Sequence, residues 1–187
     1  MITTLDKKTA LILIDLQNMV VELPLAHPVK DILHNANELA KAFRKAGQPV
    51  VIVNVNPAGA AWTKTRKESN PAARVALKEG WLDIAPDIET HPYDIFITKH
   101  TWSAFYETTL DEELKKRGVT GIVLGGISTS IGVEGTARDA SVKGYNLALA
   151  KDAMTDMFIE AHENSLKYIL PRIGEIDTTA KVIEFLL

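Results

Sequence analysis

The chain has 187 residues, of which 46% are apolar, 21 are basic and 24 are acidic, giving a net charge of −3. This length and apolar content predict a single domain over residues 1–187, built on one hydrophobic core. The nearly balanced charge argues against nucleic acid as a partner. The chain has no cysteine, which excludes disulfides, thiolate metal sites and a thiol nucleophile.

The first eight residues are polar and of mixed charge, unlike the charged and then apolar profile of a signal peptide. No stretch of the sequence approaches the roughly 18 apolar residues that a membrane-spanning helix needs. We therefore expect a cytoplasmic protein with no membrane partner.

Short apolar runs alternate with amphipathic stretches along the whole chain. The apolar runs predict strands at residues 10–14, 49–54, 93–98, 121–124, 146–150 and 174–177. Apolar residues at helical spacing predict helices at residues 29–46, 110–117, 133–142, 159–169 and 179–186. Alternating strands and helices are typical of a parallel sheet covered on both faces. We therefore predict the α/β class: a three-layer α/β/α sandwich with a mainly parallel, Rossmann-like sheet of about six strands.

Three of the predicted strands end in residues suited to chemistry. Asp15 follows the first strand, Lys99 follows the third, and a glycine-rich turn at residues 125–132 follows the fourth. Because the carboxyl ends of parallel strands share one edge, we expect these groups to meet in one crevice. Each also has a plainer interpretation: Asp15 as a helix cap, Lys99 as a solvated loop residue, and the turn as close strand–helix packing.

These motifs together resemble the isochorismatase-like (cysteine hydrolase) superfamily. The resemblance runs in order over residues 9–158 and is carried by Asp-Leu-Gln-Asn at 15–18, Lys99 with Ser-Ala-Phe at 103–105, and residues 126–133 with Thr-Ala at 136–137. In the thiol members an aspartate, a lysine and a cysteine form the catalytic set. Asp15 and Lys99 match the first two, while Gly132 stands at the position of the cysteine. The chain therefore resembles the branch that lacks the nucleophile.

The residue at position 132 limits the chemistry, because glycine cannot form an acyl-enzyme. Ser128 and Ser130 are poor substitutes, since neither has a histidine nearby in the sequence to activate it. The resemblance to isochorismatases implies hydrolysis of a vinyl ether, in which protonated Asp15 donates to the enol carbon and water adds to the oxocarbenium ion. We expect a small anionic vinyl-ether or cyclic substrate, and neither a metal nor another cofactor.

Two alternatives stay open at this stage. The chain could keep the family fold for ligand binding or scaffolding without catalysis, or it could be an amidase in which Asp15 activates water. The resemblance also implies a homo-oligomer, either a dimer or a tetramer, and a cis peptide bond between Ile127 and Ser128 that points backbone donors into the site.

The candidates for substrate binding come from the same motifs and from nearby residue types. Asn56-Pro57 replaces the Gln-Pro of siderophore-type isochorismatases, and Arg66 lies near the place of their substrate-binding arginine. The aromatic residues could line a pocket or pack against the core. The predicted set is Asn56, Arg66, Trp102, Phe105, Ile127, Ser128 and Ile131. After the fifth strand, Asp152 and Asp156 are predicted to cap the next helix.

Overall fold

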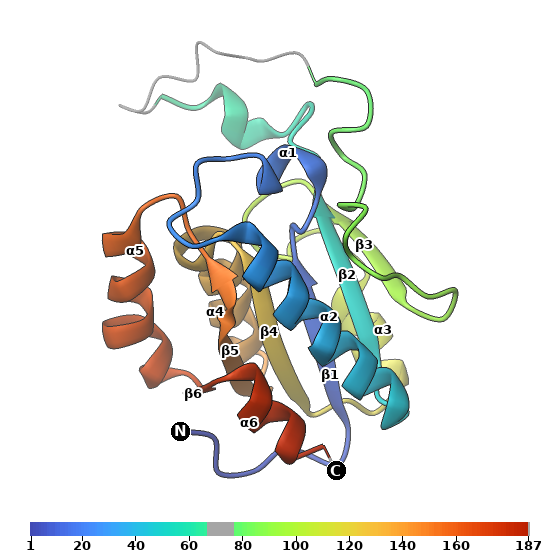
Figure 1. Cartoon of the computed structure of the whole chain (residues 1–187). Helices are drawn as coiled ribbons and strands as arrows, with labels where there is room; N and C mark the ends of the chain where they lie inside the picture. The colour runs from blue at the N-terminus through green and yellow to red at the C-terminus, as the bar shows by residue number, and fades with distance from the viewer. Residues whose placement is uncertain (67–76, 187) are drawn as a thin grey trace.

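The computed structural model describes residues 1–66 and 77–186 (Figure 1). Within these residues six strands form one sheet in the order β3-β2-β1-β4-β5-β6, and every neighbouring pair is parallel. The strands are β1 (Thr9–Ile14), β2 (Val50–Val55), β3 (Ile95–Lys99), β4 (Gly121–Ile127), β5 (Asn146–Thr155) and β6 (Glu175–Asp177). The chain order reverses between β1 and β4, which is where parallel α/β sheets bind ligands.

Helices cover both faces of this sheet, with α2 and α6 on one face and α3 and α4 on the other (Figure 1). The helices are α1 (Asn18–Val21), α2 (Val29–Lys45), α3 (Leu110–Lys116), α4 (Glu134–Val142), α5 (Ile159–Asn164) and α6 (Thr179–Glu184). Shorter turns of 3₁₀ or π type are η1 (Ala61–Lys64), η2 (Thr129–Val133), η3 (Ser165–Ile169) and η4 (Leu170–Arg172). The predicted three-layer α/β/α architecture is confirmed.

The alternation of side chains along β1 explains why the strand is continuously apolar. Leu11 and Leu13 join the core cluster beneath α2, whereas Ile12 and Ile14 join the cluster beneath α3 and α4. Successive side chains of a strand point to opposite faces, so a strand covered on both faces needs apolar residues at every position. The residue after β1 is therefore the first place where this strand can present a polar group, and that residue is Asp15.

Strand β4 is longer than the sequence predicted, because Gly125 and Gly126 belong to the strand and not to the turn. Gly126 has a φ of +120°, and a Cβ built there would lie 2.1 Å from the carbonyl oxygen of Ile14. The glycine therefore permits a close approach between the backbones of β4 and β1. The turn proper begins at Ser128.

Strand β5 also continues past its predicted end at Ala150 and reaches Thr155. Leu124 pairs with Leu149 but Gly126 pairs with Met154, so β5 bulges between these pairs. The predicted role of Asp152 was wrong for this reason. Its Oδ1 accepts hydrogen bonds from the backbone N and the Oγ1 of Thr179, at 2.7 and 2.8 Å, so it caps α6 and not the next helix.

Candidate active site

The carboxyl edge of the sheet brings together a carboxylate and an ammonium group from two strands that are not neighbours. Asp15 directly follows β1, and Lys99 is the last residue of β3, on the far side of β2. Nζ of Lys99 lies 2.7 Å from Oδ2 of Asp15, with only 2% and 8% of the two side chains exposed. The structure therefore places the two residues in direct contact, buried from solvent.

Gly132, in η2, faces this ion pair. A Cβ built on Gly132 would lie 3.3 Å from Oδ2 of Asp15, 3.6 Å from Nζ of Lys99 and 2.9 Å from Cγ2 of Ile14. Any side chain at this position would begin in contact with both charged groups. Because Gly132 has no side chain, the carboxylate of Asp15 and the ammonium group of Lys99 face the backbone of η2 at this point.

The carboxyl group of Asp15 is unusual in both its hydrogen bonding and its protonation. Its Oδ2 contacts Lys99. Its Oδ1 has no hydrogen-bond partner, and no other buried side-chain N or O atom of the described residues lacks one. Burial raises the pKa of Asp15 to about 6, although the charge and the hydrogen bond of Lys99 act in the opposite direction. A proton is therefore available on this carboxyl group close to neutral pH.

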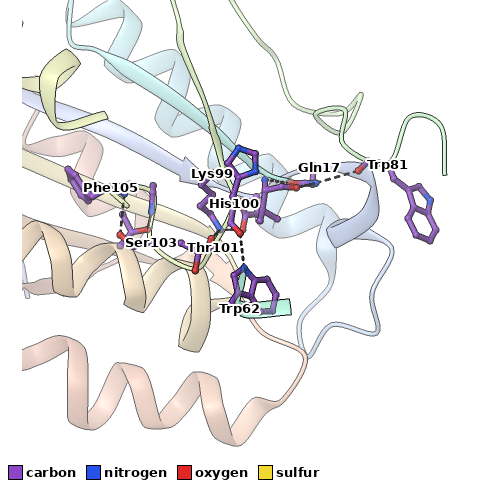
Figure 2. Close-up of polar contacts among 12 residues, drawn as sticks. Gln17, Trp62, Trp81, Lys99, His100, Thr101, Ser103 and Phe105 are labelled. Atoms are coloured by element: carbon purple, nitrogen blue, oxygen red, sulfur yellow. Dashed lines mark hydrogen bonds and ion pairs between the residues drawn. The ribbon is translucent and has the colours of Figure 1, made fainter. Parts of the chain in front are cut away.

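Lys99 is held in place from two sides. Besides contacting Asp15, its Nζ donates a hydrogen bond of 3.0 Å to the carbonyl oxygen of Thr101, as Figure 2 shows. The buried ammonium group thus has an anionic and a neutral partner, which compensates for its removal from water. Its position relative to Asp15 is fixed accordingly.

Gln17 is a buried residue of the motif at 15–18, and the motif alone predicts no role for it. Its Oε1 accepts a hydrogen bond of 2.6 Å from the backbone N of Val55, and its Nε2 donates one of 3.1 Å to the oxygen of the same residue. The side-chain amide of Gln17 thus makes the two hydrogen bonds that a neighbouring strand would make to Val55, and it joins the end of β2 to the segment after β1. Figure 2 shows Gln17 beside this region. A polar residue three positions after a buried strand was the available signal.

Asn56, His100 and Trp62 form a hydrogen-bonded rim next to Lys99, and Figure 2 shows His100 and Trp62 there. Nδ1 of His100 lies 2.7 Å from the carbonyl oxygen of Asn56, and Nε1 of Trp62 donates a hydrogen bond of 2.7 Å to the carbonyl oxygen of His100. Asn56 also donates its backbone N–H to the oxygen of Lys99 at 2.8 Å. The candidate Asn56 is therefore joined to the main chain of Lys99, and its Oδ1 accepts a hydrogen bond from the N of Ala58.

Other predicted contacts lie on the turn after β4 and on the loop after β3. The peptide bond between Ile127 and Ser128 is cis, as the family resemblance implied. Ser128 is half-buried and Ile131 is exposed within the turn. Trp102 is 56% exposed. A Cβ built on Gly135 would lie 3.4 Å from the Cβ of Trp102, so Trp102 lies beside the start of α4.

Two of the predicted candidates, Phe105 and Ile127, have side chains packed in the core and not beside the ion pair. The ring of Phe105 stacks on Tyr145 at a centroid distance of 5.9 Å within the core beneath α3 and α4, and Figure 2 shows it apart from Lys99. The side chain of Ile127 is buried in the cluster beneath α2. Arg66 is exposed at the end of a described segment. Apolar packing therefore accounts for Phe105 and Ile127.

Ser130 is engaged by a carboxylate and not by a histidine. Its backbone N and its Oγ both donate hydrogen bonds of 2.8 Å to Oδ2 of the buried Asp156. The Oδ1 of Asp156 accepts from the N of Met157, so this aspartate joins the turn to the segment before α5. The serine hydroxyl therefore helps to hold the turn against Asp156.

In the part of the chain that the structure describes, no group of three or more His, Asp or Glu side chains is arranged to hold a metal ion. Within the same residues, no helix is both long and apolar enough to cross a membrane.

A buried Asp–Lys pair thus lies at the carboxyl edge of a parallel sheet and faces the turn after β4, where position 132 is a glycine. Residues 9–181 match the family model described as the isochorismatase domain, so the chain belongs to the isochorismatase family. Family members are hydrolases of small molecules, which identifies the general class of this chain.

Individual relatives agree with this assignment. The chain is 39% identical over 184 residues to YecD of Escherichia coli O157:H7, an uncharacterized isochorismatase family protein, covering 96% of this chain and 97% of the relative. It is 28% identical over 183 residues to an isochorismatase of Bacillus subtilis, covering 89% and 54%. The structure of an isochorismatase family protein from Burkholderia thailandensis matches with a TM-score of 0.93 at 38% identity, covering 100% and 99%.

Proposed function

We propose that the chain hydrolyses a small vinyl ether of the isochorismate type, with Asp15 as the general acid and Lys99 as its charged partner. One observation carries this proposal: the buried Asp15 has one oxygen bound to Lys99, one oxygen without a partner, and a pKa of about 6. A general acid works best when its pKa lies near the operating pH.

The arrangement suggests which oxygen carries the proton. Because Oδ2 accepts a hydrogen bond from Lys99, the proton belongs on Oδ1, the oxygen left free for a substrate. Transfer of this proton to the terminal enol carbon uses the electron pair of the carbon–carbon double bond and leaves an oxocarbenium ion. Water adds to that cation and loses a proton, and the resulting hemiketal breaks its carbon–oxygen bond. The products are a keto acid and an alcohol, and Asp15 recovers its proton from solvent.

Gly132 suits this route because no step needs an enzyme nucleophile. A Cβ built on Gly132 would adjoin both Asp15 and Lys99 but would also lie 2.9 Å from Ile14, so we propose that substrate or the attacking water approaches the pair beside Gly132 when Ile14 shifts. We propose that Asn56, Trp102, Ser128 and Ile131 contact the substrate. A substrate carboxylate would pair with Arg66, whose guanidinium can bind it through two hydrogen bonds.

The test measures pyruvate released from isochorismate by the purified protein. The Asp15→Asn variant keeps the size of the side chain but cannot donate the acidic proton, so we expect a loss of about 10²- to 10⁴-fold in kcat. The matched control is Asp31→Asn, which removes an exposed carboxylate from α2. Full activity in Asp15→Asn would overturn the acid role, and no pyruvate from the wild-type protein would overturn the substrate class.

A second candidate function rests on the same carboxyl group. Above a pH of about 6 Asp15 is ionised and can accept a proton from water, as an amidase without a cysteine would require. Ammonia release from small amides, rising with pH and leaving no covalent adduct, would favour this function. A panel of vinyl ethers and amides that all stay intact, together with tight binding of a small acid, would favour a non-catalytic member.

We also propose that the protein is cytoplasmic and assembles as a dimer or a tetramer. Light scattering of the purified protein measures the number of subunits directly, and a monomer at micromolar concentration would exclude the assembly.

A further inference from the structure

The turn η2, which carries Gly132 against the ion pair, is supported from behind by the α5 and η3 segments. Nδ1 of His162, in α5, lies 2.8 Å from Oγ1 of Thr129, the first residue of the turn. Ser165, the first residue of η3, donates a hydrogen bond of 2.6 Å to Oε2 of Glu134, which directly follows the turn. His162 and Ser165 are three residues apart and so lie on the same side of the helical segment. They hold the two ends of the turn.

The hydrogen bonds around Thr129 determine which nitrogen of His162 carries a proton. Oγ1 of Thr129 also lies 3.1 Å from the carbonyl oxygen of Thr155, and a carbonyl can only accept. The single hydroxyl proton of Thr129 is therefore donated to Thr155. Nδ1 of His162 must in turn donate to the threonine oxygen, so a neutral His162 has its proton on Nδ1 and none on Nε2.

The surroundings of His162 favour this neutral form. The residue is only 5% exposed, and the ring of His27, from the loop before α2, lies 4.7 Å away between centroids. Burial lowers the pKa of His162, and His27 lowers it further, against the opposing charges of Asp156 and Glu163. His27 is itself fixed, because its Nδ1 lies 2.8 Å from Oγ1 of Thr155. The two imidazoles thus form a pair in which His162 is buried and His27 is half-buried.

We propose that His162 is a positioning residue of this site: as the neutral Nδ1–H tautomer it fixes Thr129 and thereby sets how closely Gly132 approaches Asp15 and Lys99. The kinetic part of this inference rests on the proposed hydrolysis, whereas the tautomer and the position of the turn do not. Gly132 lies three residues after Thr129, within the same turn, so loosening Thr129 lets Gly132 move relative to the ion pair. Small displacements of this kind lower rates without removing any reacting group.

The reaction-independent test is nuclear magnetic resonance of the ¹⁵N-labelled protein. At pH 7 the imidazole signals that disappear in His162→Asn should show a protonated Nδ1 and an unprotonated Nε2. The Thr129→Val variant keeps the shape of the side chain but removes both hydrogen bonds of the hydroxyl, and it should move the amide signal of Gly132. The Thr129→Ser variant keeps the hydroxyl and should leave that signal near its wild-type position. A protonated Nε2, or a Gly132 amide that does not respond to Thr129→Val, would overturn the proposal.

The kinetic test compares two changes at position 162. His162→Leu removes the donor, and we expect kcat for isochorismate to fall roughly 10- to 100-fold with a smaller change in KM. His162→Asn places an amide N–H near the position of Nδ1 and should restore most of that loss. Equal losses in the two variants, or a change in the melting temperature with kcat intact, would show a merely structural role. If the wild-type protein releases no pyruvate, the proposed function fails while the spectra still decide the role of His162.

Discussion

Lys99 contacts only one of the two carboxyl oxygens of Asp15, at 2.7 Å, and leaves the other buried without a partner. An ion pair that served stability alone would be expected to satisfy both oxygens, because an unpaired buried polar atom costs free energy. The free Oδ1 is the atom to which we propose that a substrate atom binds.

The first prediction concerns the pH dependence of activity. If Asp15 donates a proton, only its protonated form is active, and its pKa is raised by burial to about 6. We expect kcat/KM to be constant well below this pH and to fall about tenfold for each pH unit above it. Initial rates of pyruvate release between pH 4.5 and 8.5 measure this profile. A rate that rises through pH 6 would instead assign Asp15 the role of a base.

The second prediction tests the opposing influence of Lys99. The charge and the hydrogen bond of Lys99 lower the pKa of Asp15, so Lys99→Met should raise that pKa further. The pH at which activity begins to fall should move upward, whatever happens to the maximal rate. Lys115→Met, at an exposed lysine on α3, is the matched control and should leave the profile in place. A downward shift in Lys99→Met would contradict the assigned direction.

The third prediction concerns stability. The folded chain binds the proton of Asp15 more tightly than the unfolded chain, whose carboxyl has the ordinary pKa of 3.8. This contribution to stability is fully present below pH 3.8 and is lost as the pH rises to about 6. The shift corresponds to about 3 kcal/mol in the free energy of unfolding.

Comparison with Asp15→Asn isolates this effect, since the variant lacks the titrating group. Between pH 4 and pH 7 the wild-type protein should lose up to about 3 kcal/mol of unfolding free energy relative to the variant. Urea unfolding at a series of pH values measures the difference. A difference that stays constant over this range would show that Asp15 has an ordinary pKa in the folded protein.

The three layers and the parallel sheet were accessible from the sequence because they follow from local pattern, and the meeting of Asp15 and Lys99 followed from their places at strand ends. A strand buried on both faces leaves an unmistakable apolar run, and the first polar residue after it lies at the carboxyl edge of the sheet. The position of Gly132 followed from the family motif. The structure then placed it within contact distance of both charged groups.

Other features depend on packing between distant segments and left no local signal. Gly126 looked like a turn residue, yet it is a strand residue whose missing side chain admits the backbone of Ile14. The bulge in β5 carries the strand past Ala150, and the ring of Phe105 finds its partner, Tyr145, forty positions away. The support of the turn by His162 likewise joins residues 33 positions apart.

The fourth prediction tests the close approach of β4 and β1. A Cβ on Gly126 would lie 2.1 Å from the oxygen of Ile14, and its φ of +120° is itself unfavourable for other residues. Gly126→Ala should therefore destabilise the protein by more than about 4 kcal/mol or prevent folding. Gly144→Ala is the matched control, because Gly144 also has a positive φ but nothing within 4 Å of its Cβ position. That control should cost only about 1–2 kcal/mol, and equal losses in thermal or urea unfolding would contradict the steric explanation.

The fifth prediction tests whether position 132 still faces the chemistry. The Cβ in Gly132→Cys would start 3.6 Å from Nζ of Lys99 and 3.3 Å from Oδ2 of Asp15, once Ile14 has shifted slightly to relieve its 2.9 Å contact. A neighbouring ammonium group favours the thiolate, and the thiolate is the reactive form of cysteine.

Because the wild-type chain has no cysteine, the variant carries a single thiol whose alkylation by iodoacetamide can be followed by mass spectrometry. At pH 7 we expect this thiol to react about tenfold faster than the exposed thiol of Lys41→Cys, despite its burial, because more of it is ionised. Adding Lys99→Met should remove the advantage. If the Gly132→Cys thiol reacts more slowly than the exposed control, with or without Lys99, the ion pair does not act on this position. The proposed approach of substrate beside Gly132 would then lose its support.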